Sequence, residues 1–218
     1  MLGKYETLET DAAASARGVW IEIGIGAKPE AGYLHCDIAY RPGVDCMCDA
    51  ARLPFADQVA SRIFCRHLLE HLDAETAAQA VREWHRVLRL DGVLDINVPD
   101  LAVHCIQLAR PGASRYMLRA YGTLVSNHEH ALRSIFGWQQ DQHHYHFWGY
   151  TTDSLRTLLG QAGFCDITRI DDGMFCNIRF VARKGPGNPN YKDRRPISTR
   201  LRGAWNGFFA LVVAKSTF

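Results

Sequence analysis

The sequence predicts an α/β fold built around a mainly parallel sheet. In the first hundred residues, short apolar runs alternate with polar turns and one long amphipathic segment, which is the rhythm of a parallel sheet crossed by helices. A glycine turn from Gly24 to Gly26 directly follows the first apolar run. Further on, two apolar runs flank Asp171-Asp172-Gly173, which is typical of a hairpin. We therefore expect a seven-stranded sheet that ends in an antiparallel pair.

Seven apolar runs supply the expected strands. They fall at 19–23, 33–36, 44–48, 62–65, 93–98, 164–170 and 175–182. Between the fourth and fifth runs, Asp73 is a favoured helix N-cap. Asp91-Gly92 is expected to end the helix that follows. Four apolar residues repeat on one face of that helix: Ala77, Val81, Trp84 and Leu88.

Residues 100–150 break the alternation. Segments 101–110 and 116–125 have helical patterns, and a stretch rich in histidine, glutamine and aromatic residues follows. We therefore expect a helical insertion over the sheet edge at about 100–150. A further helix, 151–162, is expected to start at Thr151 or Thr152 and to precede the last two strands.

Composition narrows the class of protein. A chain of 218 residues with 47% hydrophobic residues can bury the core of one α/β domain. A net charge of +2 makes nucleic acid an unexpected partner. Seven cysteines without a CxxC pair favour a reducing, cytoplasmic compartment and no metal. The N-terminus is too polar for a signal peptide, and no apolar stretch reaches membrane-spanning length.

The last residues differ from the rest. We expect one domain at 1–184 and an extension at 185–218, in which a glycine- and proline-rich segment precedes a basic segment and an apolar run. This extension is compatible with a solvated face, a docking arm for an anionic partner, a contact with a membrane surface, or an oligomer contact.

The glycine turn and the next strand end predict a nucleoside-binding edge. Glycines allow the backbone to approach a ligand closely, and Asp37, at the end of the second strand, can accept hydrogen bonds from two ribose hydroxyls.

The motifs of this chain, and the order in which they occur, resemble those of the class I S-adenosylmethionine-dependent methyltransferases, in particular small bacterial members with a short first crossover. The resemblance covers about 17–183 and implies a Rossmann-like sheet with S-adenosylmethionine as the cofactor. It is carried by Glu22-Ile-Gly24-Ile-Gly26, Asp37, Asp49-Ala50 with Leu53-Pro54-Phe55, His67-Leu-Leu-Glu70-His71, the segment from Trp84 to Gly92, and 146–155 before Gly163.

The resemblance also implies roles for individual residues. The backbone at the two glycines is expected to run close to the methionine part of the cofactor. Glu22 is expected to help hold the ammonium group of that part. Asp37 takes the ribose, and Arg66 and His67 border the sulfonium. The adenine is expected to contact Asp49, Ala50 and Leu53.

The first crossover departs from the usual pattern. Ala27 stands where a third glycine often occurs, and Asp37 lies only 13 positions after Gly24. A parallel crossover usually needs a dozen or more residues, often with a helix. We therefore predict a tight loop at Lys28-Pro29 in place of a first helix.

Histidines are the candidates for a catalytic base. His67 and His71 follow the fourth strand, and in a helix they would share one face beside Glu70. His144 and His146 are second candidates, in a cluster that can equally be an exposed loop. Packing or capping is the alternative for His71. A metal site is less favoured, because the spacing matches no standard ligand set.

We therefore expect methyl transfer to a hydroxyl of a small molecule or glycan. Three alternatives stay open: a catalytically silent cofactor-binding or docking protein that works through its basic extension, an RNA-directed methyltransferase, and a nicotinamide oxidoreductase.

Overall fold

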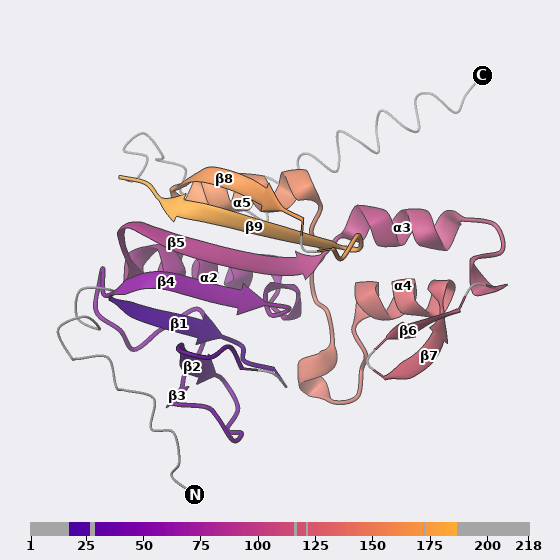
Figure 1. The fold of residues 1–218 in the computed structure, drawn as a ribbon, viewed down its shortest axis with the longest axis horizontal. Coiled ribbons are helices and arrows are strands. Elements are labelled where there is room, and N and C mark those ends of the chain that lie inside the picture. Colours follow the sequence, from indigo (N-terminus) through magenta and orange to yellow (C-terminus); the bar gives the residue numbers. More distant parts are fainter. Residues whose placement is uncertain (1–17, 27–28, 116, 121, 172, 187–218) are drawn as a thin grey trace, which may run out of the picture.

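A seven-stranded sheet organises the molecule (Figure 1). The computed structural model describes residues 18–26, 29–115, 117–120, 122–171 and 173–186. The strand order is β3-β2-β1-β4-β5-β9-β8, and β9 runs antiparallel to both of its neighbours. The predicted fold class is therefore confirmed. The strands are β1 (Val19–Ile23), β2 (Leu34–Asp37), β3 (Cys46–Met47), β4 (Ala60–Arg66), β5 (Leu88–Pro99), β8 (Phe164–Ile170) and β9 (Asn177–Lys184).

The register brings three strand ends to one edge. Ile23 of β1 pairs with Cys36 of β2 on one side and with Cys65 of β4 on the other. Gly24, Asp37 and Arg66, each one position further along, therefore lie at the same carboxyl edge. Ligands of open α/β sheets bind at this edge.

Two helices cover one face of the sheet (Figure 1). They are α2 (Ala74–Val87) and α5 (Thr152–Ala162). The Asp73 side chain caps α2, as predicted, by accepting from two backbone amides, and Thr151 caps α5 in a capping box with Ser154. The core between these layers consists of fully buried side chains, among them Ile21, Ile63, Trp84, Leu155 and Phe180.

The fifth strand begins earlier than predicted. It starts at Leu88, immediately after α2, rather than after Asp91-Gly92. Ala60 pairs with Leu88 and Arg62 with Val93, so residues 89–92 form a bulge in β5. A Cβ on Gly92 would lie 2.8 Å from the Arg89 carbonyl oxygen. Asp91-Gly92 therefore shapes a bulge inside the strand instead of ending a helix.

The insertion contains less helix than predicted. It comprises α3 (Leu101–Ala109), which Asp100 caps, then η2 (Ala113–Arg115), β6 (Met117–Ala120), β7 (Thr123–Ser126), α4 (Asn127–Phe136) and η3 (Gln142–His144). The helix expected at 116–125 is wrong, because β6 and β7 form an antiparallel hairpin there. Gly122 at the turn has a φ of 78°. Such a conformation suits a turn, and glycine in a helix interior costs about 1 kcal/mol relative to alanine.

Two connections complete the description. Residues 24–26 and 29–33 contain no helix, which agrees with the short crossover, although Lys28 lies outside the described residues. The β8–β9 connection runs over 171–176, so it is longer than the tight turn that Asp171-Asp172-Gly173 suggested. In the described ranges, no helix is long and apolar enough to cross a membrane. The extension from 187 onward lies outside them.

Candidate active site

Two glycines after β1 have different surroundings. Gly24 and Gly26 both have left-handed φ angles, 74° and 56°. A Cβ on Gly24 would lie 2.4 Å from Leu68 Cδ1, whereas a Cβ on Gly26 would meet nothing within 4 Å. Gly24 is therefore needed for packing within the fold, while Gly26 presents bare backbone to open space.

Glu22 organises the short crossover. Its buried carboxylate accepts the Glu30 amide at 2.8 Å and lies 3.4 Å from His35 Nε2. His35 Nε2 in turn lies 2.8 Å from the Glu30 carbonyl oxygen. Burial raises the pKa of Glu22, against the lowering effect of the Glu30 amide. The carboxylate thus holds the loop that replaces a helix between β1 and β2.

Asp37 stands at the end of β2 with little exposure. Its Oδ1 accepts from the Ala39 amide at 3.0 Å and lies 3.6 Å from Arg41 Nη2. Its carbonyl oxygen accepts from Cys48 N at 2.9 Å, which ties the end of β3 to the end of β2. The next acidic side chain, Asp49, is therefore brought to the same edge.

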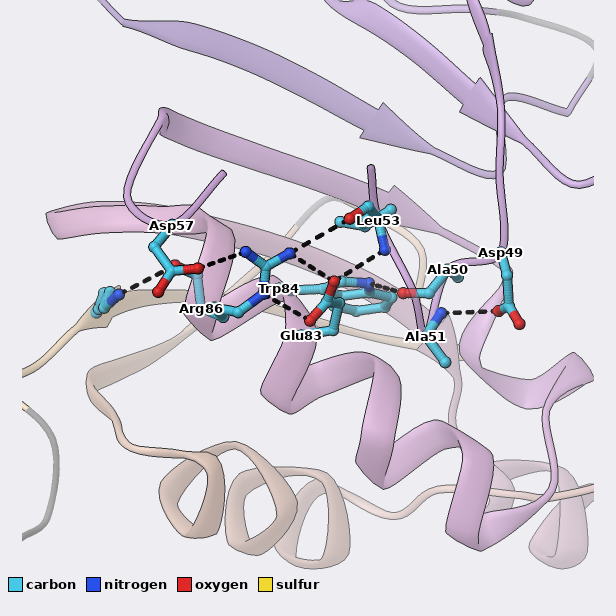
Figure 2. A network of polar contacts seen from close by, with 9 residues as sticks. Asp49, Ala50, Ala51, Leu53, Asp57, Glu83, Trp84 and Arg86 are labelled. Atoms are coloured by element: carbon cyan, nitrogen blue, oxygen red, sulfur yellow. Dashed lines mark hydrogen bonds and ion pairs between the residues drawn. The ribbon is translucent and has the colours of Figure 1, made fainter. Parts of the chain in front are cut away.

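The loop that carries Asp49 is anchored on α2 (Figure 2). Asp49 Oδ1 accepts from the Ala51 amide at 2.8 Å. The Ala50 carbonyl oxygen accepts from Trp84 Nε1 at 2.9 Å in the core, and the Leu53 amide donates to a Glu83 oxygen at 2.9 Å. Two backbone groups of the loop are thus fixed by side chains of one helix.

A charged pair reinforces this anchor (Figure 2). Arg86 donates to both oxygens of Glu83, to Asp57 and to the Leu53 carbonyl oxygen. The Arg86 hydrogen bonds hold the pKa of Glu83 below its usual range. These contacts indicate a structural role for Trp84 and Arg86 of the Trp84–Gly92 motif and for the neighbouring Glu83, because all three hold the 49–57 loop in place.

Replacing Trp84 with phenylalanine is expected to lower the free energy of unfolding by about 1–3 kcal/mol, because the buried Ala50 carbonyl oxygen loses its donor. S-adenosylmethionine should also bind more weakly, since the 49–57 loop is less fixed. Urea unfolding and calorimetric titration measure the two effects. Trp20→Phe is the control, because Trp20 is 38% exposed. Equal effects of the two substitutions would contradict the anchoring role.

The end of β4 carries Arg66 and His67. Arg66 Nη2 lies 3.4 Å from a Glu30 carboxylate oxygen, and its guanidinium lies over the Phe64 ring. Arg66 therefore connects β4 to the crossover loop. His67 has a left-handed φ of 51°, and its amide donates to the Asn97 carbonyl oxygen at 2.9 Å. A histidine in this conformation at a strand end is uncommon and often functional.

His67 is held between two polar side chains. Its Nδ1 donates to Glu70 Oε1 at 3.0 Å, and its Nε2 lies 3.4 Å from Asn177 Nδ2. Glu70 is almost completely buried. Burial alone would raise its pKa, but the His67 hydrogen bond and the neighbouring imidazoles hold the pKa below its usual range. The ionised carboxylate keeps the proton on Nδ1, so Nε2 can act as an acceptor.

The other candidate histidines lie in two places. His71 belongs to the short helix η1 (Leu69–His71), which starts too late to include His67, so the two do not share a helical face. His146 instead stacks edge-on against His71, with ring centroids 4.7 Å apart. His144 is exposed and pairs with Asp141 at 2.9 Å. The structure therefore groups His67, His71 and His146 around Glu70, and leaves His144 on the surface.

Two contacts of this site have no signal in the sequence. Asn177 reaches His67 only because β9 pairs antiparallel with β5 and begins opposite Pro99. The Glu70 carbonyl oxygen accepts from the Phe147 and Trp148 amides at 2.9 and 3.2 Å, so residues after η3 dock on η1. Neighbouring elements far apart in the chain make both contacts.

Comparison with known proteins supports the methyl-transfer interpretation. Residues 27–96 match a family model described as a methyltransferase domain, and this range includes Asp37, Asp49 and His67. A search of curated proteins found no match.

Solved structures share the fold at low identity. A possible histamine N-methyltransferase from Thermotoga maritima aligns with a TM-score of 0.52 and 15% identity, over 77% of this chain and 82% of that chain. Human N-acetylserotonin methyltransferase, in complex with S-adenosylmethionine, aligns with a TM-score of 0.50 and 13% identity, over 78% of this chain and 48% of that chain. A possible exported protein from Bordetella parapertussis aligns with a TM-score of 0.49 and 15% identity, over 80% of this chain and 65% of that chain. This chain thus spans less than two thirds of the human and Bordetella proteins.

Proposed function

We propose that this chain is a class I S-adenosylmethionine-dependent methyltransferase that methylates a hydroxyl of a small-molecule or sugar acceptor, with His67 as the general base. The match of residues 27–96 to a methyltransferase-domain model and the seven-stranded sheet support this proposal. S-adenosylmethionine, the cofactor of this class, supplies an electrophilic methyl group on a sulfonium. The residues of the chain have to hold the cofactor, align the acceptor and remove a proton.

The carboxyl edge of the sheet suits the cofactor. The open space beside Gly26 admits a ligand against the backbone. Asp37 uses Oδ1 for Ala39, so we assign Oδ2 to the ribose. We assign the contacts with the adenine to three residues of the anchored loop, Asp49, Ala50 and Leu53. Gly24 and Glu22 support the methionine end, and Arg66 completes the wall of the site beside His67.

The pairing of His67 with Glu70 carries the proposal. A buried carboxylate on Nδ1 orients the imidazole and stabilises the imidazolium that forms when Nε2 takes a proton. With S-adenosylmethionine bound, the acceptor oxygen would supply the electron pair of the new bond to the methyl carbon, and the electron pair of the breaking carbon–sulfur bond would go to sulfur. The acceptor proton passes to His67 Nε2. A base of this kind is not needed for an acceptor that is already a free amine.

Exposed aromatic side chains support a ring-shaped acceptor. Phe147 is 62% exposed and directly follows His146, and Phe175 is 72% exposed two residues before Asn177. Aromatic rings of this kind stack on the apolar face of a sugar or a second ring. This feature favours a glycan or small aromatic alcohol.

Methyl transfer from labelled S-adenosylmethionine to a panel of sugars, phenols and amines tests the proposal. His67→Asn is expected to slow O-methylation by roughly 10²–10⁴-fold without a change in S-adenosylhomocysteine affinity. His128→Asn is the matched control, because His128 is an exposed histidine of α4. Full activity in His67→Asn, or methylation of amines alone, would contradict it.

A further inference from the structure

Glu70, His71 and His146 form a cluster that the methyl-transfer mechanism does not use as a whole. One carboxylate oxygen and one ring nitrogen from each histidine all lie within 4.8 Å of one another. Glu70 and His71 come from η1, at the carboxyl end of β4, and His146 follows η3 in the insertion. The cluster therefore joins the sheet to the insertion that lies beyond the strand ends (Figure 1).

The Glu70 carboxylate is only half satisfied. Oε1 accepts from His67, but Oε2 is buried and has no hydrogen-bond partner among the described residues. A buried, charged oxygen without a partner is costly, and such groups are normally paired or bound to a metal. The exposed fraction of Glu70 is 1%, so bulk water does not supply the missing partner.

Both histidines are oriented by backbone carbonyl groups. His71 Nδ1 donates to the Tyr145 carbonyl oxygen, and His146 Nδ1 donates to that of Ser134, each at 2.9 Å. A carbonyl oxygen only accepts, so each Nδ1 carries a proton, and Nε2 is the nitrogen whose lone pair the neutral ring offers to a ligand. Histidines that bind metals are typically fixed in this way, by donating their second N–H to a backbone carbonyl or a carboxylate.

We propose that Glu70 Oε2, His71 Nε2 and His146 Nε2 bind one divalent transition-metal ion, with Zn²⁺ as the favoured occupant. Two imidazoles and one carboxylate, with a further position open, are the ligand set of several zinc sites, whereas Ca²⁺ and Mg²⁺ prefer sites made of oxygen alone. Bond lengths near 2.1 Å place tetrahedral ligands about 3.4 Å apart, and the ligand atoms of this cluster all lie within 4.8 Å of one another. This site goes beyond the proposed acceptor chemistry and does not depend on it.

A hydrogen-bonded network is the competing explanation. A cavity of about 10 Å³ is lined by Glu70, Pro99, Leu101 and Trp148 among others. That volume is near the minimum for one water molecule. A water in this cavity would satisfy Glu70 without a metal, and the cluster would then only join η1 to the insertion.

Zn²⁺ titration of the full chain, monitored by competition with a chromophoric chelator, distinguishes the metal site from the hydrogen-bonded network. The wild-type chain is expected to bind Zn²⁺ at this site, and His146→Gln, Glu70→Gln and His71→Gln should each weaken that binding by at least 10- to 100-fold. His128→Gln is the control. Circular dichroism confirms that each variant is folded.

A second group of potential ligands requires its own control. Cys36, Cys46 and Cys48 also have ligand atoms within 4.8 Å of one another, and the Cys36 hydrogen bond lowers the pKa of Cys48 to about 7. The Cys46→Ser, Cys48→Ser double variant should keep the Glu70 site, and Co²⁺ bound there should lack thiolate-to-metal charge-transfer absorption. The proposal is overturned if folded His146→Gln binds Zn²⁺ like the wild type, if only the cysteine variant loses Zn²⁺, or if the wild type binds none.

Discussion

Replacing Gly24 with alanine is expected to lower the free energy of unfolding by about 2–5 kcal/mol, the sum of a left-handed φ and an overpacked contact. The added Cβ would lie 2.4 Å from Leu68 Cδ1 and 3.0 Å from Leu68 Cβ, so the whole Leu68 side chain has to move. Leu68 directly follows His67, so the change also displaces the end of β4. Urea unfolding and calorimetric titration with S-adenosylmethionine measure both consequences.

Gly26→Ala separates folding from cofactor binding. Its φ of 56° costs about 1–2 kcal/mol for alanine, but the new methyl group meets open space. We therefore expect a smaller loss of stability than in Gly24→Ala, together with a clear loss of S-adenosylmethionine affinity. If the two substitutions cost the same stability, the Leu68 contact is not what requires Gly24. Normal affinity in Gly26→Ala would place the cofactor elsewhere.

Asp37→Asn is expected to weaken S-adenosylmethionine binding by about 10- to 100-fold. Hydrogen bonds from ribose hydroxyls to a carboxylate are worth about 1.5–3 kcal/mol, and asparagine loses the charge and replaces one oxygen with an amide nitrogen. Asparagine keeps one oxygen for the Ala39 amide, so the turn after β2 should survive.

Titration calorimetry with S-adenosylmethionine and with S-adenosylhomocysteine measures this effect. Asp153→Asn, an exposed aspartate in the first turn of α5, is the control. Unchanged affinity in folded Asp37→Asn would reject the ribose assignment and leave the role of this carboxylate to its contacts with Ala39 and Arg41.

The sheet could be predicted from the sequence largely because local signals agree with the fold. The alternation of apolar runs located all seven strands, and Asp73 and Asp100 cap helices as their residue types suggest. The hairpin at 117–126 was missed because its apolar residues also fit a helical period. Pairing of Met117 with Ser126 and the left-handed Gly122 decide between the two structures.

The candidate site could be predicted only at the carboxyl edge of the sheet. Parallel strands end together, so residues such as Asp37 and Asp49 converge whatever the details of the loops. The surroundings of His67 depend instead on tertiary contacts. Asn177 lies 110 positions after His67 and contacts it because β9 pairs antiparallel with β5. The segment around His146 contacts Glu70 through backbone amides. No local pattern encodes either contact.

A crystal structure of the full chain with S-adenosylhomocysteine tests the central claim most directly. We expect the ribose hydroxyls within hydrogen-bond distance of Asp37, the adenine against the loop anchored by Trp84, and the sulfur facing His67. A nucleoside bound at another edge of the sheet, or a sulfur turned away from His67, would contradict the account.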